Sequence, residues 1–391
     1  MVGILPTAGI FYRNETIIKH LNKNIQMSFI KNIFGKKDTP INSNSDFWNW
    51  FQQNEKTFFK VVKTHKDIEK DFFDKLSPKL AELNDGYFYL TGMYNEDNAE
   101  LILTADGNAK NIVFVEELVE QAPNINGWKF TALKPAMDIE NVSINMNGYT
   151  FDSENLFFYS NDYPGYPDEI DICVIHNERT EDNKQEIGNG TYIFLDNYLG
   201  ELDFLNNIDN LKIISKYEAE KELVPIAKLK DFLTWRQKEF IEKYEGVRYD
   251  TENDEHSILE AELESENNLI AVINTQLLNW DSKASHPWIA VITFQYDGSN
   301  NNGMPYGDDY QNLDEIEDGI MEQLTDKDGY LYIGRQTANN EREIYFACKD
   351  FRKPSKVFFK TQKENSDKFE IDYEIYKDKY WQSFERFKPK L

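Results

Sequence analysis

The spacing of hydrophobic positions changes several times along this chain and predicts a mixed α+β fold. In the last third, β-rich runs at 329–338 and 341–348 flank Asn339-Asn340, a pattern typical of a β-hairpin. Upstream, a helix is predicted over 314–326. Its apolar face is expected to carry Leu313, Ile316, Ile320, Met321 and Leu324. With strands at 288–296 and 369–376 and a helix near 353–364, the order predicts a C-terminal ferredoxin-like (split βαβ) domain with an antiparallel sheet.

The preceding part of the chain predicts a further α+β region. It contains a helical stripe over 66–84, a hairpin at 87–94 and 100–104, and a strand at 128–133. Strands are then expected at 149–151, 155–160, 170–175 and 191–195, followed by a helix near 196–207. We therefore predict an extension and linker at 1–45, an α+β region at 46–225 and the C-terminal domain at 226–391. The α+β region is open to division into 46–137 and 138–225. Met27 begins a run typical of a natural start, so residues 1–26 are expected to precede the initiator.

Charge narrows the choice of partners. The formal net charge is −26, which disfavours contact with nucleic acid and with anionic membranes. Residues 246–330 hold nineteen carboxylates against Arg248, Lys283 and Lys327, and residues 250–266 hold eight carboxylates without a lysine or arginine. Such a run is either a solvated connector or a docking surface for a basic partner.

Other sequence features limit the chemistry. Cys173 and Cys348 are far apart in apolar runs, which indicates buried thiols and a cytoplasmic setting. No apolar run is long enough to span a membrane, and no nucleotide, zinc or nucleophile motif is present. We therefore expect no cofactor.

The hairpin supplies the first candidate binding residues. A two-residue turn would place Thr337 opposite Arg342 and Ile333 opposite Phe346. Leu331, Ile333, Ile344, Phe346 and Cys348 would then share the core face, with Arg335 at its open end and Glu343 on the opposite face beside Tyr332 and Tyr345. A guanidinium at that position requires a partner. The pattern favours an ion pair or a carbonyl contact and leaves anion binding open.

Aromatic and acidic residues supply two further candidates. Trp280 and Trp288 fit either core packing or a binding groove. The carboxylates Asp308, Asp309, Asp314, Glu315 and Asp318 crowd one loop–helix junction. They could bind magnesium or calcium, although acids in the first turn of a helix also stabilise its dipole.

The run Gly334-Arg335-Gln-Thr337, a turn and Arg342-Glu343-Ile-Tyr-Phe346 resembles the bacterial family called domain of unknown function 695. Trp280, Pro287-Trp288 and the Gly-Met-Pro loop at 303–305 add to the likeness, which covers about 267–376. Residues from about 47 to 215 are similar to the region found beside this domain. A weaker likeness is to regulator of ribonuclease E activity B. None of these resemblances implies a catalytic residue.

These observations favour a non-catalytic cytosolic binding or regulatory protein. Its acidic surface would engage a basic protein partner, with a nuclease or a toxin as the candidates. The alternative is a metal-assisted hydrolase that uses the carboxylates between Asp308 and Asp318.

Overall fold

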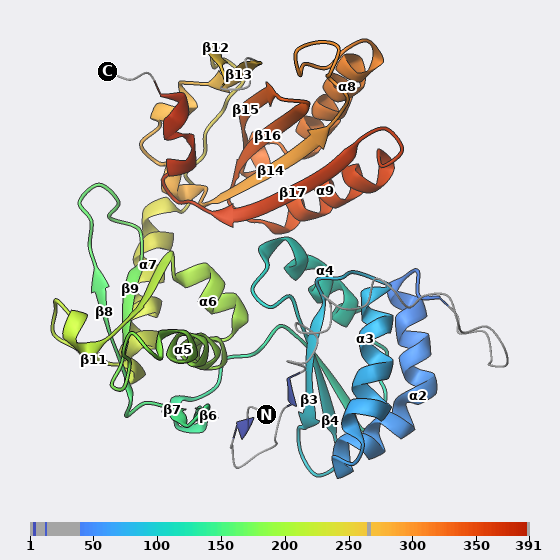
Figure 1. Cartoon of the computed structure of the whole chain (residues 1–391), viewed down its shortest axis with the longest axis vertical. Helices are drawn as coiled ribbons and strands as arrows, with labels where there is room; N and C mark the ends of the chain where they lie inside the picture. The colour runs from blue at the N-terminus through green and yellow to red at the C-terminus, as the bar shows by residue number, and fades with distance from the viewer. Residues whose placement is uncertain (1–2, 5–11, 14–39, 264–266, 389–391) are drawn as a thin grey trace. The chain divides into compact units, whose positions relative to one another are not determined.

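The computed structural model describes residues 3–4, 12–13, 40–263 and 267–388 (Figure 1). It divides into two compact units. Unit 1 comprises Met1–Asn161 and Asp171–Leu233, and unit 2 comprises Asp162–Ile170 and Thr234–Leu391. Most of the predicted extension, including the start at Met27, lies outside the described residues. The domain boundaries predicted from the sequence stay predictions.

Unit 1 is a mixed α+β unit. Its first sheet has the order β2-β3-β4-β5, and its second has the order β10-β9-β8-β11. The helices of unit 1 are α2 (Asn44–Thr64), α3 (Asp74–Ala81), α4 (Ala109–Glu120), α5 (Lys184–Leu199) and α6 (Glu201–Asn207), and α7 (Leu229–Tyr244) runs on into unit 2. The strands are β1 (Gly3–Ile4), β2 (Tyr12–Arg13), β3 (Phe88–Met93), β4 (Ala99–Thr104), β5 (Trp128–Ala132), β6 (Ile144–Met146), β7 (Tyr149–Phe151), β8 (Leu156–Asn161), β9 (Asp171–His176), β10 (Asn210–Ile214) and β11 (Val224–Pro225).

Aromatic packing holds the first sheet to its helices. Trp128 on β5 lies 5.0 Å from Phe51 on α2, measured between ring centroids, and 6.3 Å from Phe72.

The hairpin predicted at 87–94 and 100–104 is confirmed as the antiparallel pair β3–β4. The predicted strand at 191–195 is wrong, because these residues form part of α5. Thr191, Phe194, Leu195 and Tyr198 are buried at helical spacing, and burial of this face outweighs the β propensity of the segment.

Unit 2 contains one six-stranded sheet with the order β12-β13-β15-β16-β14-β17, in which every pairing is antiparallel. Its strands are β12 (His256–Glu262), β13 (Asn268–Asn274), β14 (Trp288–Gln295), β15 (Tyr330–Ala338), β16 (Glu341–Cys348) and β17 (Glu370–Lys377). Its further helices are α8 (Asp308–Gln323) and α9 (Arg352–Glu364), and a 3-10 helix spans Gln382–Phe387. The whole fold is therefore mixed α+β. The six-stranded sheet is fully antiparallel, and each four-stranded sheet of unit 1 combines antiparallel pairs with one parallel pair, β4–β5 or β9–β10.

The predicted hairpin is confirmed as β15–β16. Asn339 and Asn340 form its turn with φ angles of 49° and 69°. Two left-handed residues in succession give the turn a twist that matches that of the strands. Thr337 faces Arg342 as predicted.

One part of the predicted register is wrong. The ladder shifts between Tyr332 and Gly334, so Phe346 faces Tyr332 and not Ile333. Gly334 has a φ of 143°, and a Cβ on it would lie 2.2 Å from the carbonyl oxygen of Val272. Only glycine therefore fits at this close approach between β15 and β13.

The shift changes which side chains share a face. Leu331 and Ile333 join Tyr345 and Ala347 in a core cluster with Trp381, Phe384 and Phe387. Phe346 packs on the opposite face, 5.5 Å from Tyr332 and 6.2 Å from Phe358 of α9, measured between ring centroids. The predicted common face for Leu331, Ile333, Ile344, Phe346 and Cys348 is wrong, because one extra residue in a strand reverses the alternation beyond it.

Candidate functional site

Two arginines of the hairpin meet two carboxylates of α8, and we call these four residues the hairpin–helix cluster. Arg335 Nη1 lies 2.8 Å from Glu317 Oε2 and 3.3 Å from Asp314 Oδ1. Arg342 Nη1 lies 2.7 Å from Asp314 Oδ1 and 3.6 Å from Glu317 Oε2. Two positive and two negative charges therefore balance at the interface between sheet and helix.

Local structure explains why these side chains converge. Arg335 and Arg342 follow the bulge at Gly334 and lie on the face of the sheet that bears Tyr332, whose hydroxyl donates a hydrogen bond to Glu317. On α8, Asp314 and Glu317 are three positions apart and so lie on one side of the helix. Leu313, Glu317 and Ile320 are the buried residues of that side, whereas Met321 is 39% exposed. The prediction of Met321 on the core face is therefore wrong.

Burial determines the electrostatics of the cluster. Burial by itself would lower the pKa of Arg335, but Glu317 and then Asp314 outweigh it and raise that pKa. Burial and the nearby Glu317 both raise the pKa of Tyr332. Arg342 is 2% exposed, and among the described residues its Nε has no hydrogen-bond partner. Arg335 therefore remains charged and Tyr332 remains neutral near neutral pH.

The structure brings some of the sequence-predicted residues together and separates others. Arg335, Arg342 and Asp314 meet in the cluster, and Thr337 is buried beside Arg342 on the adjacent strand. Glu343 lies on the opposite face, where it accepts hydrogen bonds from Gln336 Nε2 at 3.0 Å and from Tyr345 Oη at 2.8 Å. Its predicted position beside Tyr345 is confirmed. The prediction that Tyr332 shares that face is wrong because of the bulge.

The two tryptophans belong to separate regions of the core. Trp280 packs 5.0 Å from Tyr249 and 6.2 Å from Trp381, measured between ring centroids, on the face that carries the core cluster. Trp288 is 4% exposed and lies 4.7 Å from Phe351. The two indoles therefore pack in separate regions, and their role in binding stays a prediction.

The acidic residues at the start of α8 have different environments. Asp308 and Asp309 occupy its first turn, where carboxylates stabilise the positive end of the helix dipole. Asp314 is committed to the arginines, and Glu315 and Asp318 are exposed. Within residues 40–263 and 267–388, no group of three or more histidine, cysteine, aspartate or glutamate side chains is placed to hold a metal.

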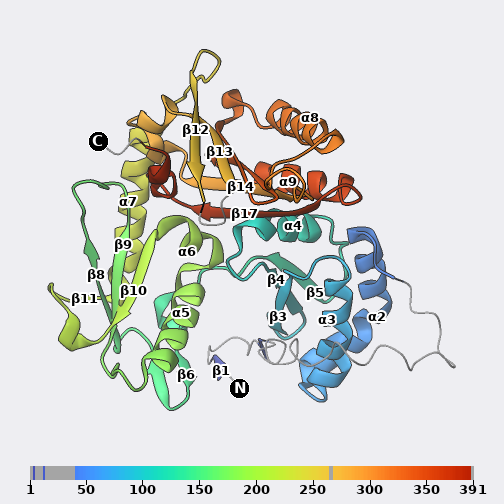
Figure 2. The ribbon, with the colours of Figure 1, turned by 45° about the horizontal axis from the view of Figure 1, so that its top comes forward.

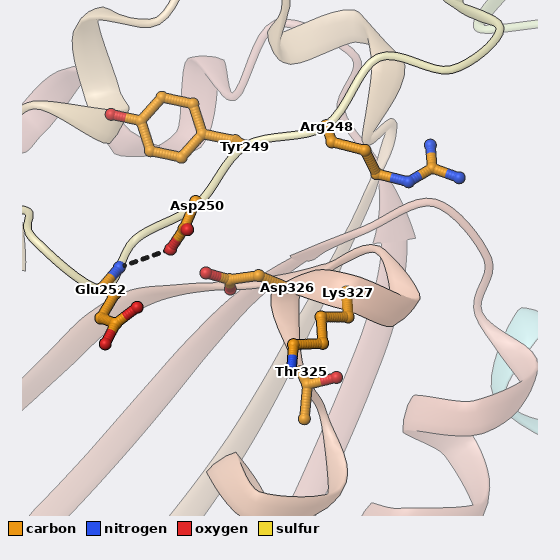
Figure 3. Close-up of a pocket in the computed structure, with 7 residues that line it drawn as sticks. All are labelled: Arg248, Tyr249, Asp250, Glu252, Thr325, Asp326 and Lys327. Atoms are coloured by element: carbon orange, nitrogen blue, oxygen red, sulfur yellow. Dashed lines mark hydrogen bonds between the residues drawn. The ribbon is translucent and has the colours of Figure 1, made fainter.

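Sequence reasoning missed a pocket of about 600 Å³ in unit 2. It is lined by Arg248, Tyr249, Asp250 and Glu252 from one stretch of the chain and by Thr325, Asp326 and Lys327 from another, as Figure 3 shows. Asp326 Oδ2 accepts hydrogen bonds of 2.7 Å from both the amide and the hydroxyl of Thr251. The pocket has side chains of both charges. Its two walls lie about seventy residues apart in the chain, so no local sequence pattern predicts it.

A second charged cluster lies in unit 1, at the carboxyl ends of the parallel strands β4 and β5. Lys134 Nζ contacts Asp106 at 2.9 Å and also pairs with Asp196. Glu201, at 1% exposure, accepts hydrogen bonds from the amides of Ala105, Gly107 and Lys134. Burial opposes the charge of Lys134, but Asp196 and Asp106 raise its pKa, so this lysine is unsuited to act as a base or nucleophile.

The hairpin, α8 and the core cluster lie within one stretch of sequence that is shared with a known family. Residues 261–387 match the family of unknown function DUF695. The DUF695 region begins within β12 and ends with the 3-10 helix, so it contains the hairpin–helix cluster. No curated protein and no solved structure matches the chain. No described helix is long and apolar enough to cross a lipid bilayer.

Proposed function

We propose that this protein is a non-catalytic binding or regulatory protein that engages a basic partner protein through an acidic surface. The observation that carries the proposal is a set of exposed carboxylates within a stretch of sequence that has no lysine or arginine. We call the set the acidic edge, and its members are Asp250, Glu252, Glu255, Glu260 and Glu262. Residues 249–282 contain no lysine or arginine.

The hairpin–helix cluster supports the same proposal. Its two arginines are neutralised by Asp314 and Glu317, so they do not offset the charge outside. The outer side of α8 adds the exposed carboxylates Glu315, Asp318 and Glu322. A surface of one sign steers an oppositely charged partner and accelerates its association, and this effect weakens as salt screens the charges. A nuclease that is restrained or a toxin that is neutralised would provide such a basic surface.

The test compares two immobilised variant baits with a wild-type bait in the native lysate. In the first bait, Glu252, Glu255, Glu260 and Glu262 are replaced by glutamine. In the control bait, the exposed residues Glu69, Glu120, Glu154 and Asp182 of unit 1 are replaced by the corresponding amides, so the net charge changes equally. We expect the control and the wild-type bait to retain one basic protein that the first bait loses, and salt to elute it. Equal retention by all three baits would contradict the proposal.

We also propose that residues 288–377 form a ferredoxin-like domain, which β13 and β12 extend at one edge. Two observations support this finer description of the fold. The strand order β17-β14-β16-β15 is that of a split βαβ unit, and α8 and α9 follow its first and third strands. An experimental structure that paired β17 with a strand other than β14 would contradict it.

A cytoplasmic location is part of the proposal. Cys173 and Cys348 are both free and buried, which is compatible with a reducing compartment. Cell fractionation with an antibody against the chain tests this, and recovery outside the cytoplasmic fraction would contradict it.

A further inference from the structure

The strand β12 lies at one end of the six-stranded sheet (Figure 2). It also carries Glu260 and Glu262 of the acidic edge. Its only pairing partner among the described residues is β13. A strand with one unpaired side presents a row of backbone donors and acceptors to which a further strand can bind.

Hydrogen bonding between β12 and β13 shows which residues of β12 direct their backbone groups away from β13. The amide of Leu263 donates to the carbonyl of Asn267 over 2.9 Å, in register with the β12–β13 ladder. Bonded and non-bonded pairs alternate in an antiparallel ladder. Ala261, Leu259 and Ser257 therefore bond to β13, whereas the backbone groups of Glu262, Glu260 and Ile258 point to the free side.

The side chains of these outward-pointing residues lie on the face that bears the hairpin–helix cluster. Ile258 faces Val272, which in turn faces Arg335, and the ring of His256 lies 5.9 Å from that of Tyr332, measured between centroids. Ile258 is 68% exposed. The free side of β12 therefore combines a solvated apolar contact at Ile258 with negative charge at Glu260 and Glu262.

Charge decides between possible occupants of this edge. A second copy of the chain would bring glutamates against glutamates, and like charges in opposed strand positions destabilise pairing. Charges on an edge strand oppose such self-association. A strand that carries lysine or arginine opposite Glu260 and Glu262, and an apolar residue opposite Ile258, would complement the edge in both charge and hydrophobicity.

We propose that β12 takes up an extended, lysine- or arginine-rich segment of the partner as an additional strand of the sheet. This inference rests on the proposed function and specifies how the partner binds. Backbone hydrogen bonds would supply affinity, and the glutamates would select basic sequences.

Two synthetic peptides test the proposal on the full-length protein by fluorescence anisotropy. The first, Thr-Lys-Thr-Lys-Thr-Val-Thr, would place its lysines opposite Glu262 and Glu260 and its valine opposite Ile258 in an antiparallel pairing. The second has the same sequence with the backbone amides of its lysines and its valine methylated, so it has equal charge but cannot donate to the free side of β12. We expect the first peptide to bind at least ten times more tightly than the second. Equal binding, or no binding of either, would overturn strand addition.

Two variants at one position give an independent measurement. Ile258→Pro removes an outward amide and leaves the β12–β13 hydrogen bonds intact, which is where edge strands accept proline. Ile258→Thr keeps the amide. We expect the proline variant to weaken binding of the lysine–valine peptide at least tenfold and the threonine variant to weaken it less than threefold. Circular dichroism confirms folding, and the comparison of peptides on the wild-type protein decides the question if the proline variant unfolds.

The outcomes separate this inference from the proposed function. If Glu260→Gln with Glu262→Gln weakens peptide binding and Ile258→Pro does not, strand addition is wrong and acidic docking stands. If Ile258→Pro abolishes binding while the glutamine variant and high salt leave it unchanged, strand addition stands and the electrostatic proposal fails. A wild-type dimer that Ile258→Pro dissociates would show that a second copy occupies the edge and would overturn the proposed occupant.

Discussion

Asp314 on α8 and Arg342 on β16 are joined by a contact of 2.7 Å, although 28 residues separate them in the chain. Arg342 is almost completely buried, so this contact neutralises a charge that would otherwise stand in a region of low dielectric. The pair connects the acidic helix to the centre of the sheet.

Asp314→Ala should lower the free energy of unfolding by about 2–3 kcal/mol, because Arg342 would keep only the longer contact to Glu317. Asp318→Ala on the same helix is the control, since this carboxylate is exposed, and its effect should stay within about 0.5 kcal/mol. Urea unfolding followed by circular dichroism measures both. Equal effects would show that the ion pair does not hold α8.

Gly334→Ala should destabilise unit 2 by at least about 3 kcal/mol, because the new Cβ would lie 2.2 Å from the carbonyl oxygen of Val272. Gly319→Ala in α8 is the matched control. Its Cβ meets nothing within 4 Å, so alanine should stabilise the helix by up to about 1 kcal/mol. Thermal unfolding of the two variants should therefore shift in opposite directions. A tolerated alanine at 334 would contradict the bulge.

His286 should make stability depend on pH. Burial, with Lys349 and Arg248 nearby, lowers the pKa of its imidazole to about 3 from an ordinary value of 6.5. Between pH 6.5 and about 3, this imidazole binds a proton in the unfolded chain but not in the folded chain. The contribution of neutral His286 to the free energy of unfolding is therefore complete above pH 6.5 and declines as the pH falls toward 3.

This decline should have a slope of up to about 1.4 kcal/mol per pH unit. Guanidinium unfolding at several pH values measures it. His286→Gln should reduce the slope, and His256→Gln, at an exposed position, should retain that of the wild type. An unchanged slope in His286→Gln would refute the assignment.

Tyr380→Phe should destabilise the protein by about 1–2 kcal/mol and make it more sensitive to acid. The Tyr380 hydroxyl donates to Asp168 Oδ2 over 2.6 Å and accepts from the Asp168 amide over 3.0 Å. Burial opposes ionisation of Asp168, but Lys243, Tyr380 and Tyr244 outweigh it and lower its pKa.

The stabilisation from ionised Asp168 is complete above its ordinary pKa of 3.8 and is lost as the pH falls below that value. Without the Tyr380 hydroxyl the pKa is lowered less, so acid unfolding should begin at a higher pH. Tyr217→Phe, at 98% exposure, serves as the control and should leave the acid transition in place. Coincident transitions in the two variants would argue against the contact.

The local signals in the sequence predicted much of the C-terminal fold. Asn339-Asn340 indicated a hairpin because few residues other than glycine accept two consecutive left-handed conformations, and the structure has that turn. The need of Arg335 for a partner also followed from elementary electrostatics. Its partners could not be chosen, because the rotation of α8 that presents Asp314 and Glu317, and not Met321, depends on packing against the sheet.

The errors have physical causes as well. The bulge at Gly334 arises from the close approach of β13, which begins about sixty residues upstream. The residues next to Gly334 in the sequence therefore do not predict it. The segment 191–195 has the composition of a strand but is helical, because its buried positions lie on one side of α5. Long-range contacts decided both cases.

The assignment of Asp162–Ile170 to unit 2 has a practical consequence. The strands β8 and β9 on either side of this segment belong to unit 1, so the chain visits the second unit, returns, and enters it again at Thr234. A fragment that starts at residue 226 would lack Asp168, and Lys243, Tyr244 and Tyr380 would lose a shared acceptor. The gene therefore cannot be divided at one codon into two complete units. Recombination that exchanges only the C-terminal part would separate unit 2 from its segment Asp162–Ile170.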